Sequence, residues 1–437
     1  MSSTITKTRL DNGLTVLLKE MHHAPVATFM IWYRVGSRNE LPGHTGVSHW
    51  VEHMMFKGTP QFPGATMERM ISREGGFWNA FTWLDYTAYY ETMPSDRIDL
   101  ALQLESDRMV NTQMTLEEVE SERTVILSER AMYENQPNFL LDEELTAAAF
   151  RVHPYHHEVI GDTADLRSMT RDTLYAHYRR HYTPTNAIAV VVGDFTTADM
   201  LARIETLFGA IPSGDPTAPI LRDEPDQPGE RRVIVNGPGD TAYLTFAYRV
   251  PGAAHPDYPA LSLLNAAFAG GSSLGMFAGG GSNRSSRLYK ALVSTELAAG
   301  AYGGLTPTID PFLYSISAVV RAGRSLVEVE AALEAEIARL AAEPITPAEL
   351  AKALKRARAQ FIMAGESISG QAQLIGAAEA TTGDYGWFES VLERLNSVTI
   401  EDIERVRRRY LNPRNRTVGW YEPNGHAAVA DDDEPAE

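Results

Sequence analysis

The sequence predicts an α+β protein made of two similar domains, and three features support this prediction. Strand-like and helix-like segments alternate along the chain. Residues 213–231 are rich in proline and charge, which is typical of a linker. Pro184 and Asn186, which precede a valine-rich stretch, have counterparts 229 residues later in Pro413 and Asn415, which also precede a strand-like stretch.

We therefore expect a first domain at residues 1–212, a linker at 213–231 and a second, similar domain at 232–426. The last residues, 427–437, include the acidic run Asp431–Glu434 and are expected to be disordered. A chain of 437 residues is long enough for two or three domains, and its 44% hydrophobic residues support sizeable cores.

The composition excludes several classes of function. The formal net charge of −18 argues against a nucleic-acid partner and slightly favours basic peptides or proteins as substrates. The absence of cysteine excludes disulfides and thiolate metal sites. No stretch reaches the length of a membrane span, and the first residues contain no apolar signal region. We expect a cytoplasmic protein, with the periplasm as the alternative.

The first domain begins with strand-like segments at Leu14–Lys19 and Val26–Val35. A helix is expected at Thr45–Thr59, because apolar residues dominate this stretch and a glycine and a proline can end it. A short helix at Met67–Arg73 follows.

The helix at Thr45–Thr59 contains His49, Glu52 and His53 in a His-x-x-Glu-His pattern. Residues four apart in a helix lie one above the other, so the two imidazoles can bind one ion. Glu52 lies near the same face and can reach a water at that ion, which is the place for a general base. Two surface histidines on a helix are the alternative interpretation.

A hairpin is expected next, with strands at Phe77–Thr82 and Tyr86–Thr92 and a turn at Trp83–Asp85. From its residues alone it is an ordinary aromatic-rich hairpin of the sheet.

Helices are expected at Arg97–Val110 and Thr115–Asn135, the second opened by a capping box of Thr115 and Glu118. In the second helix, Glu122 and Glu129 fall in the middle of an apolar face formed by Val119, Val125, Ile126, Met132 and Tyr133. Buried carboxylates need a cationic partner. A zinc site would provide one, and an arginine network is the alternative.

The segment His153–Glu158 is a rival metal site on composition, but the side chains of the adjacent His156 and His157 diverge and Pro154 breaks local regularity. We expect a loop there. The first domain then continues with a helix at Thr170–Arg180, a buried strand at Ala187–Gly193 and a helix at Thr196–Leu207.

In the second domain, Asn265–Tyr289 is rich in glycine and serine but lacks the Gly-Lys-Ser/Thr ending of a phosphate loop, so nucleotide binding is not expected. Helices are expected at Leu326–Ala341 and Pro347–Ala364. This half contains no His-x-x-Glu-His pattern, so a metal would belong to the first domain.

The pattern of His49, Glu52 and His53, with Glu129 standing 76 positions after His53, resembles the inverted-motif zinc peptidases of the pitrilysin/insulinase family. The resemblance covers nearly the whole chain, and the half-length chain is similar to the mitochondrial-processing-peptidase and small bacterial branch. The flanking segments that agree with it are Gly36–Glu40, His53–Thr59, Gly75–Thr82, Thr87–Tyr90 and Glu122–Glu129.

The resemblance implies one zinc ion (Zn2+) per chain, with His49, His53 and Glu129 as ligands and Glu52 as general base. It implies that Glu122 supports the ligands from outside the coordination sphere.

The resemblance also implies that an edge strand pairs with the backbone of the substrate through Asn79, Ala80, Phe81 and Thr82. It implies that the glycine-rich segment contacts or gates the substrate, with a mobile connection as the alternative. The resemblance also supports the expectation that each domain is a mostly antiparallel sheet with helices packed on one side.

The expected function is that of a zinc endopeptidase acting on unfolded peptides of limited size. The alternative is a non-catalytic scaffold or assembly subunit, for which the respiratory-complex core proteins of this family are the precedent. A scaffold does not need the intact metal-binding residues.

The resemblance implies that two half-length chains close face to face. In active members the second domain carries an arginine and, seven residues later, a tyrosine, which bind the substrate carbonyl. This chain has Val293 and Gly300 at those positions. We therefore expect a heterodimer with a homologous subunit that supplies the pair. A homodimer that uses Tyr302 or Arg287 is the alternative.

Overall fold

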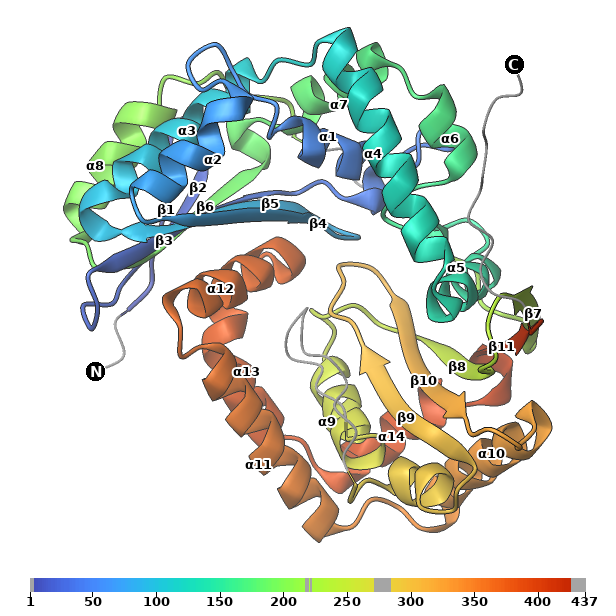
Figure 1. Ribbon diagram of the computed structural model, residues 1–437. Helices are drawn as coiled ribbons and strands as arrows, with labels where there is room; N and C mark the ends of the chain where they lie inside the picture. Colours follow the sequence, from blue (N-terminus) through green and yellow to red (C-terminus); the bar gives the residue numbers. More distant parts are fainter. Residues whose placement is uncertain (1–3, 217–219, 221, 271–283, 426–437) are drawn as a thin grey trace, which may run out of the picture.

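The computed structural model describes residues 4–216, 220, 222–270 and 284–425, and two β-sheets organise these residues (Figure 1). The first sheet has the strand order β1 (Thr6–Arg9), β2 (Thr15–Glu20), β6 (Ala187–Gly193), β3 (Val26–Tyr33), β5 (Thr87–Pro94) and β4 (Phe77–Thr82). The second has the order β7 (Arg231–Gly237), β11 (Arg416–Pro423), β8 (Tyr243–Val250), β10 (Phe312–Val320) and β9 (Ala298–Leu305). Within the described sheets, neighbouring strands are antiparallel except for the pairs β2–β6 and β7–β11, so the predicted α+β class with mostly antiparallel sheets is confirmed.

The two sheets share one connectivity. Strands β2, β6, β3, β5 and β4 follow the same spatial order as β7, β11, β8, β10 and β9. The 229-residue echo falls at equivalent places, since short 3-10 turns at Pro184–Asn186 and Pro413–Asn415 lead into β6 and β11. In each turn the asparagine side chain donates a hydrogen bond of 2.9 Å to the carbonyl five residues earlier, at His181 and Tyr410. The sequence echo therefore marks a repeated structure.

Most helices of the first half lie on one face of the first sheet (Figure 1). Their bounds are α1 (Val47–Met54), α2 (Gly64–Arg73), α3 (Ile98–Asn111), α4 (Leu116–Glu134), α5 (Pro137–Ala149), α6 (Thr163–Ser168), α7 (Arg171–His181) and α8 (Thr197–Phe208). The second half contains α9 (Tyr258–Phe268), α10 (Leu326–Ala342), α11 (Pro347–Ala364), α12 (Ile368–Thr382), α13 (Gly386–Asn396) and α14 (Ile400–Tyr410).

Strand β6 is apolar along its length because both of its faces are buried. Its residues alternate between two cores, so that Ala189 and Val191 face the helices of the first half while Ile188 and Val190 face the opposite side. That opposite side is covered by α12, which comes from the second half and packs against β6 and β3. A strand buried on both faces loses the usual apolar-polar alternation.

The exchange of helices is reciprocal, as Figure 1 shows for α12 and α5. Helix α5 leaves the first half and packs against β7, β11 and β8 of the second sheet. Gly419 of β11 makes room for it, because a Cβ atom at that position would lie 2.8 Å from both Leu141 and Leu145 of α5. Each sheet therefore carries helices of its own half on one face and one helix of the other half on the opposite face, which the expectation of helices on a single side did not include.

Further contacts join the two halves near the predicted hairpin. The backbone N–H of Ile309 donates to Asp85 Oδ2 in the β4–β5 turn at 2.9 Å, and Arg38 pairs with Asp310.

Within the predicted linker, Glu224 accepts hydrogen bonds of 2.8 to 3.0 Å from the three backbone N–H groups of residues 151–153. These described linker residues are thus bound to the first half.

The first residues of the expected glycine-rich loop belong to a helix. The expected loop at Asn265–Tyr289 is helical in its first residues, because α9 extends to Phe268, and residues 271–283 lie outside the described residues. The acidic tail at 427–437 lies outside them as well. No helix in the described part of the chain is long and apolar enough to cross a membrane.

Candidate metal centre

Helix α1 carries the three residues of the histidine pattern, His49, Glu52 and His53. The helix is shorter than predicted, because it begins after Gly46 and ends at Met54, before Lys57. The rings of His49 and His53 lie side by side with centroids 4.6 Å apart, as the four-residue spacing predicted.

Helix α4 brings the two predicted carboxylates. The capping box is confirmed: Thr115 Oγ1 accepts from the N–H of Glu118, and the Glu118 carboxylate accepts from the N–H of Thr115. The predicted apolar face is partly wrong, because Val125 and Met132 are 49% and 67% exposed. The face that packs on the protein is a narrow one and includes a cation; it consists of Val119, Glu122, Ile126 and Arg130. Glu122 lies on this face and Glu129 at its border.

The ligand atoms of His49, His53 and Glu129 lie within 4.8 Å of one another, the one such group of three among the described residues. The distance from Glu129 Oε2 is 3.8 Å to His49 Nε2 and 3.6 Å to His53 Nε2. Ligand atoms around tetrahedral zinc lie about 2.0–2.2 Å from the ion and so about 3.3–3.6 Å from one another. The donor set therefore fits zinc, and the two distances from Glu129 lie at the upper end of this range or just above it.

The protonation state of His49 also suits a metal ligand. Burial, with a smaller contribution from the neighbouring His53, lowers the pKa of His49 to about 3. The imidazole is therefore neutral at physiological pH, and a neutral imidazole is the form that binds metal.

Glu122 lies behind His53. Its Oε1 atom is 2.7 Å from His53 Nδ1, and its other oxygen pairs with the ammonium group of Lys57. Burial alone would raise the pKa of Glu122, but the hydrogen bonds from His53 and Lys57 lower it to about 2. An ionised carboxylate at Nδ1 fixes the imidazole so that Nε2 faces Glu129.

Glu52 points from α1 toward the edge strand. Its Oε2 atom accepts a hydrogen bond of 2.6 Å from the hydroxyl of Thr82 in β4. Its side chain is almost fully buried, and burial raises the pKa of its carboxyl group to about 7 in the metal-free chain. Glu52 is therefore placed beside the candidate ligands without being one of them.

Two family comparisons match consecutive parts of the chain. Residues 15–163 match the family described as Insulinase (Peptidase family M16), and residues 168–357 match the Peptidase M16 inactive domain. The chain belongs to peptidase family M16, the insulinase family. The predicted resemblance is thereby confirmed.

Relatives of this M16 chain extend over nearly its whole length. An uncharacterized zinc protease of Mycobacterium leprae is 29% identical over 94% of this chain and 91% of its own length. A probable mitochondrial-processing peptidase subunit beta of Arabidopsis thaliana is 26% identical over 95% of this chain and 78% of its own length. The crystal structure of a protease from Helicobacter pylori superposes with a TM-score of 0.89 at 26% identity, covering 96% of this chain and all of that one. The M16 chain thus shares its fold with a bacterial protease and is similar over nearly its whole length to a protein named as a zinc protease.

The four residues expected to bind substrate lie on β4, which in the described sheet has a strand neighbour only on its β5 side. Thr82 faces Glu52, so the strand passes directly beside the candidate metal centre. Asn79 is exposed, and its side-chain oxygen accepts a hydrogen bond of 2.8 Å from the N–H of Ala80. Phe81 lies between Ala80 and Thr82 on the same strand.

The structure also describes the two positions that were expected to lack carbonyl-binding groups, and the two residues considered as replacements. Val293 ends a short helical turn at Tyr289–Val293, and Gly300 lies in β9. Arg287, a candidate replacement, is already engaged: it donates to both oxygens of Glu349 at 2.7 Å and to the carbonyl of Pro344 at 2.9 Å. Tyr302 is half-buried in β9.

Two histidines of the segment His153–Glu158 contact carboxylates. His153 Nε2 lies 3.1 Å from Asp310 Oδ2, and His157 Nε2 lies 2.9 Å from Glu40 Oε2. The expectation of a loop is met by the short 3-10 turn at Pro154–His156.

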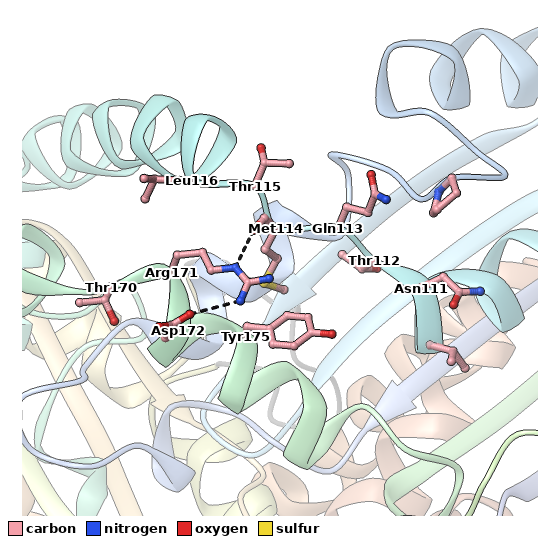
Figure 2. Close-up of a pocket in the computed structure, with 12 residues that line it drawn as sticks. Asn111, Thr112, Gln113, Met114, Thr115, Leu116, Thr170, Arg171, Asp172 and Tyr175 are labelled. Carbon is pink, nitrogen blue, oxygen red and sulfur yellow. Dashed lines mark hydrogen bonds and ion pairs between the residues drawn. The ribbon is translucent and has the colours of Figure 1, made fainter.

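A cavity of about 840 Å³ lies elsewhere, between the start of α4 and the start of α7 (Figure 2). There Arg171 donates through Nε to the carbonyl of Met114 at 2.8 Å. The Cζ atom of Arg171 lies 4.2 Å from the centre of the Tyr175 ring. None of the residues that line this cavity belongs to the candidate metal centre, so its chemistry is separate.

Sequence reasoning missed the roles of Lys57 and of Thr82 toward Glu52. Lys57 stands four residues after His53, and this spacing could have suggested a shared partner. The contact between Thr82 and Glu52 joins residues 30 positions apart, and no local spacing signals it.

Proposed function

We propose that this chain is the zinc-carrying subunit of a metalloendopeptidase that hydrolyses unfolded peptides or small proteins. The observation that carries the proposal is the convergence of His49, His53 and Glu129, with Glu52 held beside them by Thr82. The relatives named as zinc proteases support zinc as the ion.

In this proposal His49, His53 and Glu129 would hold the ion. A bound zinc ion supplies Lewis acidity, which polarises a carbonyl group and lowers the pKa of water. Glu52 accepts the proton of the attacking water and delivers it to the nitrogen of the leaving amine, so that one carboxylate serves both steps.

The chain's other residues orient these groups. Glu122 fixes the ring of His53 through Nδ1, and Lys57 keeps Glu122 ionised. The backbone of β4, from Asn79 to Thr82, pairs with an extended substrate and brings its peptide bond past Glu52. Main-chain pairing depends little on side chains, which suits an enzyme acting on varied unfolded peptides.

We further propose that the working enzyme is a heterodimer. The first half of this chain carries the metal residues, whereas its second half has Val293 and Gly300 where active members carry arginine and tyrosine. Neither residue offers a charge or a hydroxyl for the substrate carbonyl. The engagement of Arg287 with Glu349 and backbone carbonyls weakens the homodimer alternative.

A non-catalytic scaffold is the second candidate, and the match of residues 168–357 to the M16 inactive domain favours it. The complete set of metal residues in the first half favours catalysis. The two are separated by metal analysis of the purified chain together with cleavage of a peptide mixture. The peptidase requires about one zinc per chain and cleavage that stops with a chelator and returns with zinc, whereas a zinc-free chain that cleaves nothing, alone or with its partner, would establish the scaffold.

A further inference from the structure

Helix α1 begins at a residue that has no capping side chain. Helices usually start at Ser, Thr, Asp or Asn, whose side chain accepts from the first free N–H groups. The cap residue of α1 is Gly46 in the left-handed region, with φ of 84°. A Cβ atom there would lie 2.3 Å from the carbonyl oxygen of Ile160. The N–H groups at this helix start therefore need a partner from elsewhere.

Glu40 is that partner. One of its carboxylate oxygens accepts from the N–H of Gly46 and the other from the N–H of Ser48, each at 2.8 Å. The Glu40 side chain is fully buried, and its negative charge lies at the positive end of the helix dipole. The two bonds reach six and eight residues along the chain, so they fix the start of α1 relative to Glu40.

His157 holds Glu40 from the other side, with Nε2 at 2.9 Å from the carboxylate. Burial alone would lower the pKa of His157, but the hydrogen bond to Glu40 raises it above its ordinary value. A buried carboxylate is stable only when its oxygens are satisfied, and here two N–H groups and one imidazole satisfy them.

We propose that Glu40, held by His157, is a positioning residue of the metal centre. Helix α1 has only eight residues, and Ser48, whose N–H is bound by Glu40, directly precedes His49. Glu129 is on a different helix, so a small rotation or shift of α1 moves both imidazoles relative to it. The inference rests on the proposed function, because it assigns Glu40 a role in holding the zinc ligands.

The test compares Glu40→Gln and His157→Gln with a control that the same half of the chain offers. Glu20 accepts from the N–H and hydroxyl of Thr197 at 2.6 Å at the start of α8, and His22 lies 3.1 Å from it, but α8 carries no residue of the metal centre. Glu20→Gln therefore removes a similar remote cap without touching α1.

Zinc affinity is measured by competition with a chelator, and site geometry by the visible absorption of the cobalt(II)-substituted full chain. Hydrogen exchange of the Gly46 and Ser48 amides is measured in the metal-free chain. We expect Glu40→Gln to weaken zinc binding by roughly 10- to 100-fold and to change the cobalt spectrum. It should also speed exchange at both amides, with a smaller change in the same direction for His157→Gln and none for Glu20→Gln.

Unchanged zinc affinity and cobalt spectrum in a folded Glu40→Gln chain would overturn the inference and leave the proposed function intact, provided that the parent chain binds zinc and cleaves peptides. Equal losses in Glu20→Gln would also overturn it, since they would reflect general stability. If the Glu40→Gln chain does not fold, His157→Gln decides by the same measurements. If the parent chain binds no metal, the proposed function fails, and slow amide exchange lost in Glu40→Gln would show the cap alone.

Discussion

The hydroxyl of Thr82 donates a hydrogen bond of 2.6 Å to the carboxylate of Glu52. This bond joins the edge strand β4 to helix α1, and so it links the strand proposed to bind substrate with the proposed general base. The hydroxyl of Thr87 lies 3.4 Å from Thr82 Oγ1 and donates to the carbonyl of Val35, which extends the contact into the sheet.

Thr82→Val should therefore lower the turnover number more than it changes zinc content. Losing a hydrogen bond to a carboxylate costs about 1.5–3 kcal/mol, which corresponds to roughly 10- to 100-fold in rate if the bond orients Glu52 for reaction. The measurement is steady-state cleavage of a peptide, with zinc content determined in parallel. Thr82→Ser, which keeps the hydroxyl, should retain most of the activity. Equal activity in Thr82→Val and the parent chain would show that Glu52 does not need this contact.

Glu129→Gln should lower zinc content sharply, because an amide oxygen is a weaker ligand than a carboxylate and provides no negative charge. Glu122→Gln should have a smaller effect, in the range of roughly 10- to 100-fold in affinity or activity, because Glu122 acts on His53 from outside the coordination sphere. Glu117→Gln, on the exposed side of the same helix, is the matched control. Full zinc occupancy in Glu129→Gln would rule out Glu129 as the third ligand.

The chain purified alone should bind zinc but cleave peptides poorly. A homologous subunit without the zinc motif should raise cleavage, because the donors it brings to the substrate carbonyl are each worth about 10²- to 10³-fold in rate. The assay compares the lone chain, the partner alone and the mixture at equal concentrations. Full activity of the lone chain would contradict the heterodimer and favour a homodimer using other donors.

The exchanged helix α12 should be essential for stability. Gly376 faces Trp32 of β3, and a Cβ atom at that position would lie 2.2 Å from the indole Nε1. Gly376→Ala should cost about 1–3 kcal/mol of unfolding free energy, as overpacking in a core does. The measurement is denaturant unfolding. Gly365→Ala, whose Cβ would make only ordinary contacts of 3.6 Å, is the control and should be nearly neutral. Equal stability of both variants would mean that α12 can shift on the sheet without loss.

The grouping of the candidate metal ligands was predictable because much of it is encoded in local spacing. The four-residue spacing of His49 and His53 determines which way both rings point once a helix forms, and the seven-residue spacing of Glu122 and Glu129 brings both carboxylates near one side of α4. The link between the two helices came from the family resemblance and not from spacing, since nothing in the sequence itself says that α1 and α4 are neighbours.

Other features depended on tertiary contacts that a sequence pattern does not carry. Val125 and Met132 match a helical apolar face, yet they are exposed because α4 packs through the narrower face that includes Glu122 and Arg130. The apolar strand β6 predicted burial correctly, but its second face is covered by α12, which lies about 180 residues further along the chain. The contact between His157 and Glu40 was hidden for the same reason, since 117 positions separate the two residues.

The most direct test of the account is Glu52→Gln, assayed with whatever partner the active parent chain requires. The substitution keeps the shape and the hydrogen bond from Thr82 but removes the ability to take a proton. We predict zinc content equal to that of the parent chain and loss of most peptide cleavage. Cleavage by Glu52→Gln at the parental rate would contradict the assignment of Glu52 as general base, and with it the proposed mechanism.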